Sequence, residues 1–292
     1  MTAMKNLLRR FVPCAGAAGS GRRFAGPAAI VAVAAVAFTV LAFTGPRAAS
    51  GATAPVSNDP AIISAGQQLY EVHCQSCHGV NGVGGVNGAP EIIDSGAAAA
   101  DWYITTGRMP LNHPTDQALR NHPYFDAQQT EELVAYVNAL PAINNQPDRT
   151  GPGIPIVAPK CDTGTNDVPQ GCTTLTEGEQ LYSVNCAQCH HASGAGGMIS
   201  KGNIVPSLGN ATATQVAEAM RVGPQPMPVF GTGQLTDQQV SAIANYVQYL
   251  HAPNDKGGLG IGHFGPVPEG FVGIVIGFGL ILVISRLIGN RG

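Results

Sequence analysis

The sequence predicts an all-α protein with two tandem helical domains and a C-terminal transmembrane helix. Three observations predict it: an internal repeat, apolar residues at helical spacing in both copies, and an uncharged apolar segment near the C-terminus. The 292 residues are enough for two domains. We place these domains at 51–141 and 176–255, separated by a Pro/Gly-rich linker at 142–175. Residues 265–292 would form the transmembrane helix and a short tail.

The repeat is clearest where Gly66–His78 parallels Gly178–His190, at an offset of 112 residues. A helix is predicted at 60–73, since Pro60 suits a first helical position. For the corresponding helix of the second repeat, Thr176 with Glu179 predicts a capping box. A short helix is expected at 97–105. Each copy should close on a longer helix. We expect the first at about 127–139, capped by Asp126 and stopped by Pro141, and the second to be capped by Thr236. Their apolar faces correspond: Leu133, Tyr136, Val137 and Leu140 in one, Ile243, Tyr246, Val247 and Leu250 in the other.

The motif Cys-x-x-Cys-His ends both repeated stretches, at Cys74–His78 and Cys186–His190. This spacing is typical of c-type haem attachment, in which the thiols add to the porphyrin vinyl groups and the histidine binds iron. A redox Cys-x-x-Cys pair would not need the histidine, and a zinc site would need two more ligands nearby. The sequence therefore predicts two covalently bound haem c groups. Their thioethers would form at Cys74, Cys77, Cys186 and Cys189, and His78 and His190 would be axial ligands.

A second axial ligand is expected for each iron, and methionine at this position raises the potential. Met109 is the only methionine in residues 60–141, although it could instead fill a gap in the core. His113, four residues away, is the alternative ligand and would give a bis-histidine site. The second domain offers three methionines. We favour Met227, in Pro224–Pro228, because Met198 is close in sequence to His190 and Met220 sits at a helical core position.

Cys161 and Cys172 are the cysteines that remain in the body of the chain after the haem pairs are assigned. Haem attachment and disulfide formation both belong outside the cytoplasm, so we expect these two to be bonded, with two free thiols as the alternative. Cys14 precedes the first apolar run and should stay inside the cell.

Charge and hydropathy divide the chain along its length. The first 50 residues carry six basic and no acidic side chains around an apolar run, as in a signal peptide or an uncleaved signal anchor. All 18 acidic residues lie in 48–270, which argues against nucleic-acid binding and suits a basic redox partner. Phe271–Ile288 is long enough to span a membrane. Arg286 and Arg291 would place the C-terminus in the cytoplasm and the haem domains outside.

Each repeat resembles a class I cytochrome c, through the haem motif, Met109 or Met227, and the aromatic residues Tyr136 and Tyr246 of the closing helices. With its tandem domains and C-terminal helix, the whole chain resembles the dihaem cytochrome c subunit of the actinobacterial cytochrome bcc complex. The resemblance implies the electron-transfer subunit of a menaquinol:cytochrome c oxidoreductase, without a site for bond chemistry of its own. Its implied partners are a cytochrome b subunit, a Rieske iron–sulfur subunit and a terminal haem–copper oxidase.

Three other functions fit some of these features. A dihaem subunit of a haem–copper oxidase is the first, but known members look anchored at the N-terminus. A dihaem peroxidase would need a displaceable sixth ligand, whereas this chain offers a methionine in each domain. A free dihaem shuttle is opposed by the C-terminal apolar segment.

Overall fold

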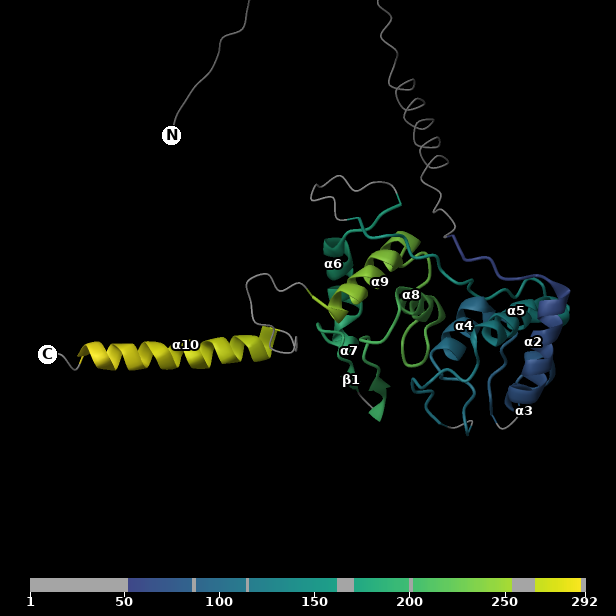
Figure 1. Cartoon of the computed structure of the whole chain (residues 1–292), viewed down its shortest axis with the longest axis horizontal. Helices are drawn as coiled ribbons and strands as arrows, with labels where there is room; N and C mark the ends of the chain where they lie inside the picture. Colours follow the sequence, from purple (N-terminus) through teal and green to yellow (C-terminus); the bar gives the residue numbers. More distant parts are fainter. Residues whose placement is uncertain are drawn as a thin grey trace, which may run out of the picture. The chain divides into compact units, whose positions relative to one another are not determined.

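The computed structural model describes residues 52–85, 88–113, 116–161, 171–199, 202–253 and 266–289. The predicted export or anchor segment at 1–50, with Cys14, lies outside the described residues, as do residues 162–170 of the linker and Arg291. Figure 1 shows α2 to α5 gathered in one helical group and α6 to α9 in a second. The two groups correspond to the two copies of the repeat.

The first group contains α2 (Pro60–His73), α3 (Gln75–His78), the 3-10 turn η1 (Val80–Gly82), α4 (Gly96–Thr105) and α5 (Ala127–Ile143). Helix α2 crosses α5 at Gly66, where a Cβ would lie 2.0 Å from the carbonyl oxygen of Glu132. Beside this crossing, the rings of Tyr70 and Tyr136 lie 5.1 Å apart. The predicted apolar face of α5 forms the core of this group.

The second group repeats this crossing with α6 (Leu175–Asn185), α7 (Ala187–His190), α8 (Ala213–Val222) and α9 (Asp237–His251). A Cβ on Gly178 would lie 2.3 Å from the carbonyl oxygen of Ala242, and the rings of Tyr182 and Tyr246 are 5.4 Å apart. A short antiparallel pair, β1 (Gly197–Met198) with β2 (Ile204–Val205), is added between α7 and α8. The described residues are therefore mostly helical, with a two-stranded ribbon that the sequence did not predict.

Two predicted helix boundaries were wrong. Pro141 does not stop α5, which continues to Ile143; a proline near the end of a helix loses one backbone bond, and the burial of Leu140 and Pro141 holds this turn in place. The predicted Thr176–Glu179 capping box is also absent, because α6 begins at Leu175. Thr174 is its N-cap, directly after the isolated bridge from Lys160 to Thr173 ends the extended chain. The caps at Asp126 and Thr236 are confirmed, both as capping boxes.

The linker packs along both groups. In its first half, the carbonyl of Ile154 accepts a hydrogen bond from the N–H of Ala54 (2.8 Å). The carbonyl of Pro152 accepts one from the N–H of Ala98 in α4 (3.0 Å). Further on, Ala158 donates to the Ser241 hydroxyl of α9 (3.0 Å). The described part of the linker therefore contacts α4 of the first group and α9 of the second.

The linker also carries a disulfide, between Cys161 and Cys172, whose Cα atoms are 5.5 Å apart. The backbone carbonyl of Cys172 accepts a hydrogen bond from the side-chain amide of Gln238 in α9. The bond thus lies where the linker meets the second group.

The last element is α10 (Pro266–Gly289), which is exposed along its described side chains. Among the described helices it alone is long and apolar enough to cross a membrane, over Gly270–Gly289. Its single charged side chain past Gly270 is Arg286, in the last turn. An apolar helix of this length suits a membrane anchor.

Candidate haem-binding sites

One helical turn holds each Cys-x-x-Cys-His motif. Cys74 ends α2 and accepts hydrogen bonds at its carbonyl from the N–H groups of Cys77 (3.1 Å) and His78 (2.9 Å). In the second copy, Cys186 accepts in the same way from Cys189 (3.1 Å) and His190 (2.9 Å). Both thiols of a motif therefore start from a single turn, which is the arrangement that attachment to one porphyrin edge requires.

A backbone carbonyl orients each histidine. The Nδ1 atom of His78 lies 2.9 Å from the Pro90 oxygen, and that of His190 lies 3.1 Å from the Pro206 oxygen. Because a carbonyl can only accept, Nδ1 must carry the proton, and Nε2 keeps the lone pair that can bind a metal. Burial lowers the pKa of His190, against the opposite effect of the Pro206 carbonyl, and so favours the neutral imidazole.

A buried tyrosine fixes the chain just after each motif. Tyr70 donates to the carbonyl of Gly79 (2.8 Å), and Tyr182 donates to that of His191 (2.7 Å). Burial, followed by the nearby motif cysteine, raises the pKa of both phenols, so they remain protonated donors. Sequence inspection noted these tyrosines only as part of the repeat, and their identical spacing from each motif was the signal of this role.

The second domain brings its predicted ligands to the wall of one cavity, which is partly open to solvent. Its wall includes Cys186, Cys189, His190 and Met227. Of the other two methionines, Met220 is also in the wall but is packed in the core with 1% of its surface exposed, whereas Met198 is 76% exposed on β1. The arrangement favours Met227 as the residue facing His190.

In the first domain, the described contacts do not bring Met109 to His78. Met109 is half-buried just after α4, where its N–H donates to the carbonyl of Tyr103 (3.1 Å). His113 is exposed, beside residues whose placement is not described. Met109 is therefore the more enclosed of the two candidates for the sixth ligand.

The residues at both motifs fit a covalently bound haem. None of the four motif cysteines is in a disulfide, and burial together with the second thiol of each motif raises the pKa of Cys74 and Cys186 to about 11. Each site combines these thiols with an imidazole whose Nε2 is free. Within the described ranges, no group of three or more His, Cys, Asp or Glu side chains is placed to hold a metal ion by itself. Two thiols and an imidazole from one helical turn suit a prosthetic group that brings its own nitrogen ligands.

Comparison with known proteins agrees with this chemistry. Residues 63–141 match the family described as cytochrome c, and residues 173–247 match the one described as cytochrome c oxidase, cbb3-type, subunit III. The chain is 36% identical to the cytochrome bc1 complex cytochrome c subunit of Mycobacterium leprae, over 79% of this chain and 76% of that protein. The subunits of the same name from Mycobacterium tuberculosis (35%, 79% and 79%) and Corynebacterium diphtheriae (31%, 80% and 83%) are similar over comparable lengths.

Proposed function

We propose, on the premise that this chain belongs to the family of cytochrome bc1 complex cytochrome c subunits, that its two domains each bind one haem c and relay electrons through that complex. The chain is a respiratory electron carrier, as its relatives are. The observation that carries the proposal is the matched pair of histidines, each held at Nδ1 by a carbonyl and free at Nε2.

The residues divide the work in the same way in both domains. Cys74 with Cys77, and Cys186 with Cys189, would hold the porphyrin edge through thioether bonds. His78 and His190 would bind iron through Nε2, with Met109 and Met227 as the opposite ligands. When bound, haem iron exchanges one electron between its ferrous and ferric states. The covalent attachment keeps both groups in one chain, so the transfer between them gains effective concentration.

The proposed partners follow from the family. Electrons would enter from a Rieske iron–sulfur subunit, beside a cytochrome b subunit, and leave towards a terminal haem–copper oxidase, making the chain a subunit of a quinol–cytochrome c reductase. Helix α10 would anchor it with the haem domains outside and the C-terminus in the cytoplasm. The Cys161–Cys172 bond agrees with such an exported location, which covalent haem attachment would also require.

The alternative of a haem–copper oxidase subunit rests on the match of residues 173–247 to the cbb3-type family. That match covers one domain, whereas the bc1 complex subunits match about 80% of the chain. Detergent extraction and affinity purification separate the two: a cytochrome b and a Rieske protein should accompany this chain. A copper oxidase core without either would overturn the bc1 assignment.

Substitution of each methionine tests the axial ligands. Met109→Ala and Met227→Ala should each keep two haems attached, because the thioether bonds do not depend on the sixth ligand. Each should remove the methionine–iron charge-transfer band of one ferric haem. Met198→Ala, at an exposed position, is the matched control and should change neither band. A Met227→Ala protein that keeps both bands would contradict the assignment in the second domain.

A further inference from the structure

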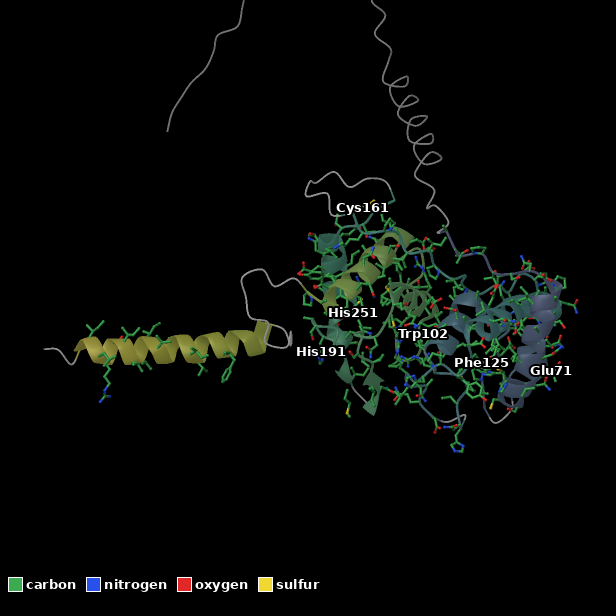
Figure 2. The ribbon with its side chains drawn as sticks, viewed as in Figure 1. Glu71, Trp102, Phe125, Cys161, His191 and His251 are labelled. Atoms are coloured by element: carbon green, nitrogen blue, oxygen red, sulfur yellow. A yellow bond between two sulfur atoms is a disulfide. The ribbon has the colours of Figure 1, made fainter. Side chains whose placement is uncertain are left out.

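The cavity that holds the second motif is walled partly by the first domain. Helices α4 and α8 pack together, and Trp102, Tyr103 and Arg108 line the same cavity as His190 and Met227, with residues 117–120 of the first domain beside them. Figure 2 labels Trp102 in this region. The second site is therefore completed by side chains from the other copy of the repeat.

Arg108 is the unusual member of this wall. Only 7% of its surface is exposed, its Nη1 donates to the Ala118 carbonyl (2.5 Å), and its Cζ lies 4.4 Å from the ring centroid of Trp102. Its Nε is buried and has no hydrogen-bond partner among the described residues. A buried cation with an unused donor is costly unless an anion is bound.

No described carboxylate lies within ion-pair distance of Arg108; the described arginine ion pairs involve Arg149 and Arg221 instead. A second cation is close. Arg120, exposed at the rim, donates through Nη2 to the Gln215 side chain of α8 (2.9 Å), and burial followed by the charge of Arg120 lowers the pKa of Arg108. Two cations beside one cavity, without an acidic partner, call for an anionic ligand inside it.

We propose that Arg108, assisted by Arg120, binds a propionate carboxylate of the haem in the second domain. The inference rests on the proposed function, which supplies the haem, and deepens it by making the first domain part of the second haem site. A guanidinium presents parallel N–H donors that match a carboxylate, and the contacts with Ala118 and Trp102 fix its plane.

This placement also links the two sites through the backbone. Arg108 directly precedes Met109, the proposed iron ligand of the first haem. The same turn after α4 would then contact both prosthetic groups, one through Arg108 and the other through Met109. Gln215 reinforces the junction, since its amide also lies 3.4 Å from the Thr105 hydroxyl of α4.

The test is a potentiometric titration of both haems in the purified complex, comparing Arg108→Gln, Arg120→Gln and a control, Arg149→Gln, at a half-buried arginine that pairs with Glu91 and Asp94. Loss of a cation beside a propionate favours the ferric state. Arg108→Gln should therefore raise the ferric-to-ferrous ratio of the second haem about tenfold at the original midpoint, equivalent to a fall of about 59 mV for one electron. Arg120→Gln should act in the same direction but less, and Arg149→Gln should leave that haem unchanged.

Two further readouts separate binding of the propionate from a structural effect. In Arg108→Gln the potential of the second haem should vary more steeply with pH, because an unpaired propionate protonates at higher pH. Arg108→Lys, which keeps the charge but lacks the fork of donors, should fall between the wild type and Arg108→Gln. A titration of Met227→Ala identifies which potential belongs to the second haem, because only that haem should change its spectrum and its potential.

The outcomes are distinct. If two haems are attached and Arg108→Gln shifts only the first haem, or neither, the inference is wrong while the proposed function stands. If Arg108→Gln fails to retain haem, an unchanged second potential in both Arg120→Gln and Arg108→Lys would overturn it. A wild-type protein without two covalent haems would instead refute the proposed function.

Discussion

The two domains hold their histidines with the same frame but are closed by different neighbours. In both, a glycine permits the helix crossing, a buried tyrosine fixes the residue after the motif, and a carbonyl orients the imidazole. Beyond this frame, the second domain adds the β1–β2 ribbon and borrows part of its cavity wall from the first. The repeat thus accounts for how each histidine is oriented. The two sites differ in the residues that surround this shared frame.

The largest effect should come from breaking the shared frame. Gly66→Ala and Gly178→Ala would each place a Cβ within 2.3 Å of a backbone oxygen on the facing helix, so the helices must separate. We expect a loss of about 3 kcal/mol of stability in the affected domain. Haem content and chemical denaturation, followed at each haem, measure this. Gly231→Ala, where a Cβ would meet nothing within 4 Å, is the control and should be nearly neutral.

A smaller effect should distinguish the second domain by its pH dependence. Glu218 of α8 is fully buried, and its two carboxyl oxygens have no hydrogen-bond partner among the described residues. Burial, followed by the charge of Asp101 on α4, raises its pKa to about 10. Between its unfolded pKa and pH 10 the folded protein binds the extra proton, so stability should fall as pH rises. The slope is at most about 1.4 kcal/mol per pH unit.

Glu218→Gln should flatten this slope, because an amide of nearly the same shape does not titrate. Urea denaturation of the intact protein at pH 6 to pH 9, followed at the second haem, measures the effect. Glu179→Gln, at an exposed glutamate, should retain the wild-type slope. An equal slope in wild type and Glu218→Gln would show that Glu218 is ionised in the folded protein.

The smallest effect concerns the residue after each histidine. Gly79 (φ 73°, ψ 175°) and His191 (φ 63°, ψ 163°) share a conformation that glycine adopts most easily. His191→Gly should therefore stabilise the second domain by about 1 kcal/mol, less the entropy cost of glycine. Thermal unfolding at the second haem tests this. Gly79→His is the reverse change and should destabilise the first domain; stabilisation there would contradict the comparison.

Local patterns predicted much of the frame. The N-caps at Asp126 and Thr236, the start of α2 at Pro60 and the apolar face of α5 all follow from neighbouring residues, and the structure confirms them. The haem ligands stay predictions that the geometry supports. The prediction that Pro141 stops α5 was wrong, because burial at the end of the helix outweighs the loss of one hydrogen bond. That burial depends on tertiary packing, which the local sequence does not show.

The role of Arg108 could not be read from its surroundings in sequence. Its unused Nε, its contact with Trp102 and the nearby Arg120 depend on how α4, α8 and residues 117–120 meet. The same holds for Glu218, whose burial against Asp101 joins residues more than a hundred positions apart. Repeats reveal what two domains share, whereas contacts between the copies leave no pattern within either one.

The bridge between Thr53 and Pro155 brings together the two ends of the first domain as one unit. Val56 and Ile154, on the two sides of that pairing, both pack against the first core, so the ends of the unit meet only after the chain has passed the closing helix α5. As the domain folds, Thr53 can pair only with a residue about a hundred positions later in the chain. A fragment comprising residues 52–156 should therefore fold by itself, whereas one ending at 141 would leave the Ala98 N–H and the Val56 side chain without their partners.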